Sequence, residues 1–267
     1  LAIAQTPRVP GKFNGARSAR WLLFGEAVRQ GCVAALAAAD GMEGDPALLD
    51  ANWLQAVGGD LSDAARLTHP EVLSDGLSIK PHPSAKQGLC AIHGLQQLLA
   101  DPRFAPEHIE AVEVHVPPAY APMLDRDPPR TNRLASLVSA PWQLALATFQ
   151  PTLLDDVARD AWPEDPRLPA FAARVRVVAD PALDALYPAS YPARLVVRTA
   201  DAQQELLVRE SPGDPALAFD AAQLIDKARR MLGAGSPGLE TVRLALQWPA
   251  QDTVPPALLR GAAASPL

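Results

Sequence analysis

Apolar and small residues recur with helical spacing near the beginning of the chain, in the segment WLLFGEAVRQGCVAALAAADG (residues 21–41). A period of three to four residues predicts a helix, and Gly41 is typical of the position where one ends. The small side chains of this pattern are Ala27, Gly31, Ala34, Ala35 and Ala38. Because small residues let helices approach closely, we expect an interior helix of a bundle. A second helix is predicted around residues 48–57.

From residue 76 the pattern changes to shorter helices and strands. The segment LCAIHGLQQLLAD (89–101) has the apolar spacing of an amphipathic helix. The run from Ile109 to Val116 alternates apolar side chains with polar ones, which predicts a half-buried strand. Residues 134–149 are helical in pattern, and Pro141 suits the first turn of a second helix there.

Strand patterns return after this helical segment. Residues 173–180 (ARVRVVAD) predict one strand. Residues 193–211 hold two alternating runs, which predict a hairpin that turns near Asp201. We expect the strands of this part of the chain to be antiparallel.

The C-terminal part returns to helical patterns. The segment SPGDPALAFDAAQLIDKARRMLG (211–233) predicts a loop and a helix, with Pro215 near its start and Gly233 at its end. A last short helix is predicted near residues 239–246.

The order of these elements is helices, then mixed strands and helices, then helices. It predicts a mostly α protein in which a helical-bundle domain is interrupted by an inserted α+β domain. The expected boundaries are 1–77 for the first helical part, 78–209 for the α+β domain and 210–267 for the helical return.

Composition narrows the possible functions. The 267 residues carry a formal net charge of −6. Non-specific nucleic-acid binding needs a basic surface, so this charge argues against a nucleic-acid partner. No apolar run reaches the ~18–20 residues of a membrane span, so we expect no membrane partner. The only cysteines, Cys32 and Cys90, lie in apolar helical patterns and are predicted to be buried thiols of a cytoplasmic protein.

Most known signatures of catalysis are absent from the sequence. It has no dinucleotide-binding, phosphate-loop, zinc-protease or serine-hydrolase motif. The five histidines lack metal-ligand spacing, and Cys90 with His93 would supply only two ligands. We therefore predict no metal site.

The segment KPHPSAKQG (80–88) is the most informative for function. Its prolines stiffen a loop that leads into a helix, and Lys80, His82 and Lys86 add three potential cations. Helix N-termini and cations both favour anions. The residues alone leave two interpretations open, an anion-binding loop or a solvated hinge with surface charge.

Four segments in order resemble the MmgE/PrpD family, whose members include 2-methylcitrate dehydratase and cis-aconitate decarboxylase. The loop at 80–88 is similar to the family's Lys-Pro-Tyr-Pro segment. The segment LASLVSAPWQLALA (134–147) resembles its Ser-x-x-Tyr-x-x-Ala helix, and ESPGDPALAFDAAQLIDKARRML (210–232) its Pro-x-Gly-x-Pro…Lys segment. Residues 19–41 are similar to its alanine-rich helix, which follows a basic residue.

The resemblance implies an architecture and a chemistry. Family members have an all-helical domain interrupted by an α+β lid, and are usually homodimers. They dehydrate, decarboxylate or epimerise small di- and tricarboxylates without metal or nucleotide, so the resemblance implies that this protein uses no cofactor. We expect this chain to hold the C-terminal part, and either to form a homodimer or to bind a partner chain that supplies the N-terminal helices.

The resemblance also assigns site residues. Lys80 falls on the family's active-site lysine, and His82 is the best remaining candidate for a base, so these two are the predicted catalytic residues. Arg20 stands where decarboxylase-type members have a lysine and is assigned to substrate binding, since arginine suits carboxylate recognition. Lys86 is assigned to substrate binding as a further cation of the loop, not by the resemblance. We expect Arg20 and Lys80 to line one cleft.

Two positions depart from the family's pattern. Ala85 stands where decarboxylase-type members have a catalytic histidine, and Leu89 where many relatives have Thr-His. Two functions therefore stay open: a lyase or isomerase of this family, or a non-catalytic member that binds carboxylates or forms a dimer. We expect the chain by itself to turn over neither 2-methylcitrate nor cis-aconitate, and to self-associate.

Overall fold

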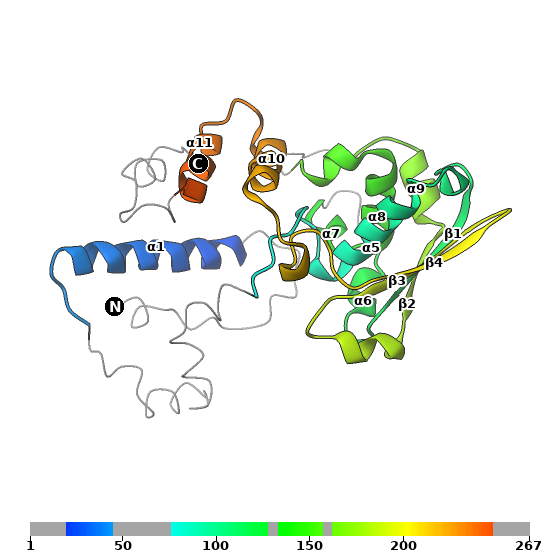
Figure 1. Cartoon of the computed structure of the whole chain (residues 1–267), viewed down its shortest axis with the longest axis horizontal. Helices are drawn as coiled ribbons and strands as arrows, with labels where there is room; N and C mark the ends of the chain where they lie inside the picture. Colours follow the sequence, from blue (N-terminus) through cyan, green and yellow to red (C-terminus); the bar gives the residue numbers. More distant parts are fainter. Residues whose placement is uncertain (1–19, 45–75, 128–132, 157–161, 248–267) are drawn as a thin grey trace. The chain divides into compact units, whose positions relative to one another are not determined.

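The structure is a computed structural model that describes residues 20–44, 76–127, 133–156 and 162–247 (Figure 1). The chain divides into two compact units, Leu1–Leu77 and Ser78–Leu267. The helix predicted around residues 48–57 lies outside the described residues. The three-part division of the sequence, with a helical bundle and a lid, stays a prediction.

The described part of the first unit is a single long helix, α1 (Arg20–Ala39), as the small-residue pattern predicts. It is followed by Gly41, whose φ of 88° favours glycine at this position. Ala34 is the only buried residue among the described side chains of α1, and Cys32 is exposed. The prediction of a buried thiol at Cys32 is therefore wrong, because no described part of this unit covers that side of the helix.

The second unit contains a four-stranded sheet in the order β2-β1-β3-β4. The strands are β1 (Ile109–Val116), β2 (Val175–Ala179), β3 (Ala193–Thr199) and β4 (Gln203–Val208). The predicted hairpin of β3 and β4 is confirmed, and β1 also pairs antiparallel with β3. However, β1 and β2 are parallel, so the expectation of a wholly antiparallel sheet is wrong.

The parallel pairing follows from a long connection, since parallel strands need a crossover between them. Between β1 and β2 lie α6 (Ala121–Leu124), α7 (Arg133–Ser136), α8 (Ala140–Phe149), η4 (Pro151–Leu154) and α9 (Arg167–Ala172). The start of α8 agrees with prediction: Ser139 caps the helix and Pro141 lies in its first turn. This crossover places α8 against the sheet beside α5 (Lys86–Leu98).

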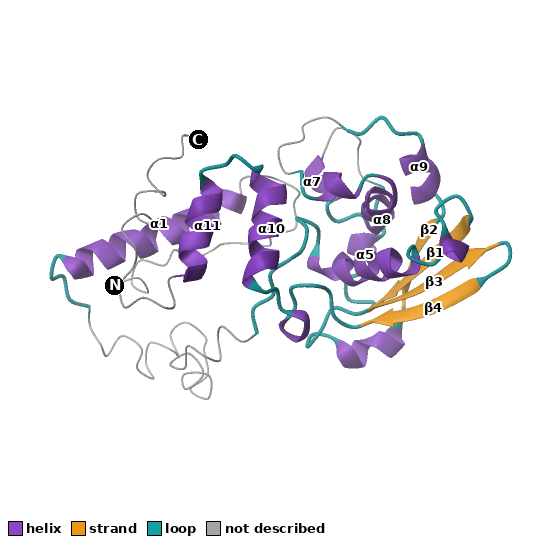
Figure 2. Ribbon diagram, turned by 45° about the horizontal axis from the view of Figure 1, so that its top comes forward, coloured by secondary structure: helices purple, strands orange, loops and turns teal. Residues whose placement is uncertain are grey.

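The core lies between the sheet and these two helices, with α5 packed on β3 and β4 and α8 on β2 (Figure 2). One face of the sheet is apolar and buried, with Val112 and Val114 of β1 and Leu195 of β3 wholly inaccessible. Gly94 allows α5 to approach closely, because a Cβ there would lie 2.4 Å from Leu195 Cδ1 and 2.8 Å from Val208 Cγ2. This packing fixes α5 on the sheet, and the loop at 80–88 leads into the N-terminal end of this helix.

Further elements complete the second unit. They are η3 (Pro102–Phe104), η5 (Pro181–Leu186), η6 (Pro215–Leu217), α10 (Ala221–Leu232) and α11 (Gly238–Gln247). Pro215 was predicted near the start of α10 but instead begins η6, whose first turn accommodates proline. Asp220 and Gln223 form a capping box that starts α10.

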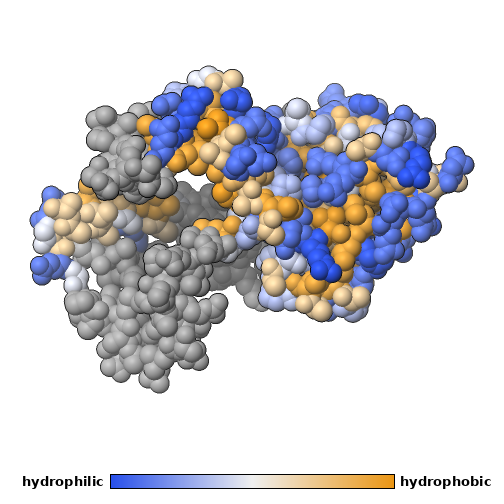
Figure 3. All heavy atoms as spheres, viewed as in Figure 1, coloured by the Kyte–Doolittle hydropathy of each residue, from blue (hydrophilic) through white to orange (hydrophobic). Residues whose placement is uncertain are grey.

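Apolar surface remains exposed on the second unit. Figure 3 shows hydrophilic residues over much of its visible surface, with an apolar area left between them. Large exposed apolar side chains include Leu207, Leu217 and Leu232, and α10 contains no buried residue. None of the described helices is both long and apolar enough to cross a membrane.

Candidate active site

The loop that carries Lys80 and His82 is held by the backbone at both ends. The Ile79 N–H donates to the Gly213 carbonyl at 2.8 Å, and the Ala85 N–H donates to the Leu137 carbonyl at 2.8 Å. Gly213 is required at this junction, because its φ is 85° and a Cβ would lie 1.9 Å from the Ile79 carbonyl oxygen. Backbone hydrogen bonds therefore brace the loop against two segments that are far from it in the sequence, around Gly213 and Leu137.

Lys80 is an exposed residue at the start of this loop. Its ammonium donates to the Ser84 carbonyl at 3.0 Å, which folds the side chain back along the loop. Arg20 begins α1 in the other unit, and its side chain lies outside the described residues. The expectation that Arg20 and Lys80 line one cleft therefore stays a prediction.

His82 is tied to an acidic residue far away in the sequence. Its Nδ1 lies 2.9 Å from Asp155 Oδ1, and the two side chains are only 15% and 5% exposed. The second oxygen of Asp155 accepts from Arg230 Nε at 2.8 Å. Burial works against ionisation of Asp155, but the hydrogen bonds from His82 and Arg230 outweigh it and hold the pKa of this carboxyl below its ordinary value. Asp155 is therefore a carboxylate at neutral pH.

Lys86 is also paired with a buried carboxylate. Its Nζ contacts Asp214 Oδ1 and lies 3.3 Å from Ser211 Oγ, while Asp214 Oδ2 accepts from the Ser211 N–H at 2.7 Å. The pKa of Asp214 is lowered: burial opposes ionisation, and hydrogen bonds from Lys86 and Ser211 overcome that effect. Burial and the charge of Asp214 raise the pKa of the neighbouring Glu210. The charge of Lys86 is thus already balanced inside the protein.

An aromatic cluster adjoins Lys86. Its Nζ lies 5.8 Å from the centroid of the Tyr191 ring, and the rings of Tyr120 and Tyr191 are 6.0 Å apart. Cys90, one turn along α5, is fully inaccessible, and burial raises the pKa of its thiol to about 12. The prediction of a buried thiol is confirmed for Cys90, and such a thiol is a poor nucleophile.

The two positions that depart from the family's pattern lie on either side of the start of α5. Ala85 is its N-cap residue, and no side chain caps the helix there. Leu89 is 1% exposed and belongs to the hydrophobic core. A leucine at this position therefore contributes packing and presents no polar group to the loop.

Trp142 occupies the tyrosine position of the Ser-x-x-Tyr-x-x-Ala pattern in α8. Its indole N–H donates to Asp127 Oδ1 at 3.2 Å, and its ring meets that of Trp162 edge-on, with centroids 4.9 Å apart. Both tryptophans line a groove of about 590 Å³ with Pro163, Pro166 and Pro169. This groove offers an apolar, aromatic surface next to the helix that carries Gln143, the partner of Ser84 in the loop.

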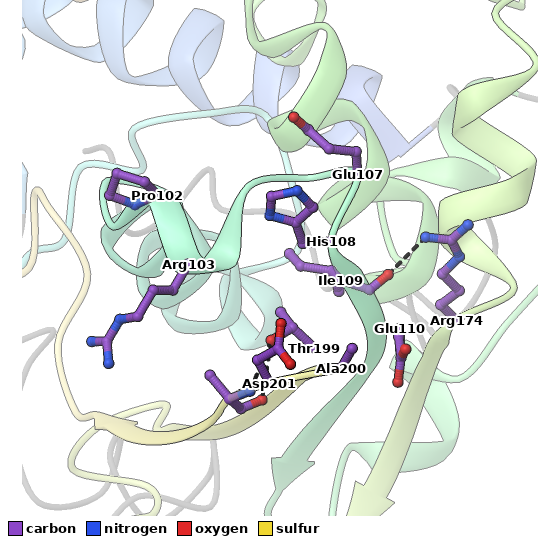
Figure 4. A pocket seen from close by; sticks show the side chains of 11 residues that line it. Pro102, Arg103, Glu107, His108, Ile109, Glu110, Arg174, Thr199, Ala200 and Asp201 are labelled. Atoms are coloured by element: carbon purple, nitrogen blue, oxygen red, sulfur yellow. Dashed lines mark hydrogen bonds between the residues drawn. The ribbon is translucent and has the colours of Figure 1, made fainter.

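A larger groove of about 910 Å³ lies at another place, where β1 begins and β3 turns into β4 (Figure 4). Its ionisable lining residues are Arg103, Glu107, His108, Glu110, Arg174 and Asp201. Arg103 is paired with Asp101, and Arg174 donates to the Ile109 carbonyl at 2.7 Å (Figure 4). Lys80, His82 and Lys86 do not line this groove, and its charges are of both signs.

A further charged network covers the outer face of the sheet. Arg194 donates to Asp180 at 2.6 Å and lies 3.1 Å from His115 Nδ1, while His115 Nε2 lies 3.2 Å from Glu113. Across the described ranges, no three His, Cys, Asp or Glu side chains gather in a way that could hold a metal ion. The charges of the outer face pair with one another across β1 and β3, as cross-strand neighbours commonly do.

Sequence reasoning found the loop but missed its partners. Asp155 holds His82, Asp214 holds Lys86, and Arg230 pairs with Asp155, yet no motif marks any of the three. Asp214 at least lies within a segment that resembles the family, whereas Asp155 follows η4 with no local signal. These residues acquire a role only because the fold brings them to the loop.

Comparison with known proteins identifies the family. The model of the MmgE/PrpD C-terminal domain matches residues 82–246, which include the loop from His82 onward, α5, the sheet, α10 and most of α11. None of the curated proteins compared with the chain matches it. The match covers more than half of the sequence and confirms the resemblance seen in its segments. The chain belongs to the MmgE/PrpD family and carries its C-terminal domain.

Proposed function

We propose that this protein is a lyase or isomerase, of the dehydratase, decarboxylase or epimerase type, that acts on a small di- or tricarboxylate. Membership of the family supports the class of reaction. The observation that carries the proposal is the braced loop, in which Lys80 supplies a cation and His82, two residues later, supplies an imidazole held by a carboxylate. Neither a metal nor an organic cofactor is part of the proposal.

The roles of these residues follow from the chemistry. Removal of a proton beside a carboxylate needs a base within hydrogen-bond reach and a cation that stabilises the developing charge. In this proposal His82 is the base, and Lys80, with Arg20, binds the carboxylates. Lys86 was expected to bind substrate too, but its pairing with Asp214 favours a role in holding the loop.

The experiment that tests this function follows substrate hydrogen exchange by ¹H NMR in D₂O. The full-length protein is mixed with a panel of di- and tricarboxylates that includes 2-methylcitrate and cis-aconitate. We expect exchange or product with at least one acid, and a fall of about a hundredfold in Lys80→Ala, since one charge-stabilising group is typically worth that much. Lys227→Ala, which removes a lysine from α10, is the matched control and should retain the wild-type rate.

A second function is favoured by one observation. The family's histidine position is occupied by Ala85, and Leu89 is buried in the core, so fewer polar groups reach the loop than in decarboxylase-type relatives. A non-catalytic member would bind carboxylates or form a dimer, for which the exposed apolar residues of α10 offer surface. Calorimetric binding of a tricarboxylate without any exchange or product would support this second function over the first.

A further inference from the structure

Asp155 contacts both His82, the candidate base, and Arg230 of α10, and both partners are far from it in the sequence. It follows η4, and its backbone N–H donates to the Thr152 carbonyl, which holds the residue at the end of that turn. Each carboxylate oxygen has its own partner, with His82 on Oδ1 and Arg230 on Oδ2. The side chain is 5% exposed, so both partners are needed to balance its burial.

The contact with Asp155 determines the proton arrangement of His82. An ionised carboxylate only accepts hydrogen bonds, so the imidazole nitrogen 2.9 Å from it must carry hydrogen. In the neutral ring that nitrogen is Nδ1, and the lone pair is then on Nε2. Among the described residues, Nε2 of His82 forms no hydrogen bond.

Arg230 holds the carboxylate from the other side. Its Nε donates to Asp155 Oδ2, and its Nη1 contacts Asp226 one turn earlier on α10. The side chain is 40% exposed, so its charge is partly shielded by solvent, but the directed bond through Nε restricts the rotation of the carboxylate. The array Arg230–Asp155–His82 therefore joins α10, η4 and the loop.

We propose that Asp155 and Arg230 are positioning residues that present Nε2 of His82 as the proton acceptor of the site. The proposal rests on the proposed function. In the step, the C–H bond beside a substrate carboxylate breaks, its electron pair delocalises into that carboxylate, and the proton forms a new bond to Nε2. The resulting imidazolium faces the Asp155 carboxylate, which stabilises it without taking the proton itself.

The alternative is that the array is only a clamp that holds the loop against α10. If the array is only a clamp, the free energy of unfolding depends on Asp155. The reaction rate then does not depend on which nitrogen of His82 carries the hydrogen. The two are distinguished by the Asp155→Asn variant, in which the amide can donate to Nδ1 and thereby move the hydrogen to Nε2. The variant keeps the shape of the array, but Nε2 of His82 then carries a hydrogen and can no longer accept the proton.

The first measurement is ¹⁵N NMR of the full-length protein labelled at histidine, with the His82 signals identified by their loss in His82→Gln. We expect the Nδ1–H tautomer in the wild-type protein and a shift toward Nε2–H in Asp155→Asn. Asp156→Asn, which changes the neighbouring acid, is the control and should leave the tautomer unchanged. The wild-type spectrum alone is decisive if a variant fails to fold, because an Nε2–H tautomer there overturns the proposal.

The second measurement is substrate hydrogen exchange with the same proteins. Asp155→Asn should lower kcat about a hundredfold or more with KM changed by less than about threefold, since it removes the acceptor but no substrate contact. Arg230→Gln should lower kcat about tenfold, and Arg229→Gln, which breaks only the exposed contact with Asp226, should not. An unchanged kcat in Asp155→Asn overturns the proposal. A wild-type protein that exchanges no substrate hydrogen overturns the proposed function instead, and the tautomer then still tests the positioning of His82.

Discussion

Two basic side chains on either side of Ala85, those of His82 and Lys86, are each paired with a buried carboxylate, but the pairs differ in which nitrogen atoms they leave available for chemistry. Lys86 and Asp214 are 17% and 4% exposed, almost the same as His82 and Asp155. An ammonium has one charged atom, and in Lys86 it is occupied by Asp214 and Ser211. An imidazole has two nitrogens, and the pairing of one leaves the other for chemistry. Similar burial thus allows a structural role in one case and a catalytic role in the other.

The largest effect on stability is expected from breaking the Lys86 pair. Lys86→Met should lower the free energy of unfolding by about 3–5 kcal/mol, because it leaves the buried Asp214 charge without its main partner. Urea unfolding at neutral pH measures this change. Arg103→Gln removes an exposed partner of Asp101 and should change the free energy of unfolding far less, because solvent screens an exposed ion pair. Equal losses in the two variants would show that the Lys86 pair is not the buried contact described here.

A smaller loss is expected at His82. His82→Gln should lower the free energy of unfolding by about 1–2 kcal/mol, because Arg230 still pairs with Asp155 after the change. Thermal and urea unfolding of this variant beside Lys86→Met sharpen the comparison. A loss at His82 as large as that at Lys86 would place His82 among the structural residues.

The carboxylates of Asp155 and Asp214 should also contribute to the loss of unfolding free energy at acidic pH. The pKa values of Asp155 and Asp214 are lowered in the folded protein, so each contributes stability that is present above the unfolded pKa of about 4 and is lost as pH falls through the folded value. Asp155→Asn and Asp214→Asn should therefore flatten the decline of unfolding free energy below about pH 4. Urea midpoints measured over this range would contradict the account if both variants kept the wild-type slope.

The smallest effect is expected at Glu210, whose pKa is raised. A raised pKa means that the folded protein disfavours the ionised carboxylate, so Glu210→Gln should stabilise the protein slightly at neutral pH, by less than about 1 kcal/mol given its partial exposure. The gain should vanish at acidic pH, where Glu210 is protonated in both states. Differential scanning calorimetry at the two pH values checks this, and a loss of stability at neutral pH would contradict it.

Sequence reasoning succeeded where the signal is local. The alternation of β1, the apolar spacing of α5 and the second helix start at Pro141 all depend on neighbouring residues, and all three were predicted. The family segments were likewise readable, because their spacing is a property of the chain. Such features need no knowledge of the packing.

It failed where distant segments meet. The parallel pairing of β1 with β2 depends on the path of the whole crossover, so the alternating pattern could not reveal it. Asp155 and Arg230 are 75 positions apart and interact only because α10 reaches the loop. The sequence therefore proposes Lys80 and His82 as site residues, which stays a prediction, but it could not reveal that Asp155 and Arg230 hold His82.

The central claim, that His82 carries chemistry and Lys86 does not, is tested most directly by substrate hydrogen exchange in two variants of the full-length protein. His82→Gln and Lys86→Met are compared with the wild type at a temperature where unfolding curves show all three to be folded. The account predicts a fall of about a hundredfold or more in His82→Gln and, per folded molecule, a much smaller change in Lys86→Met. Exchange at the wild-type rate in folded His82→Gln would contradict it.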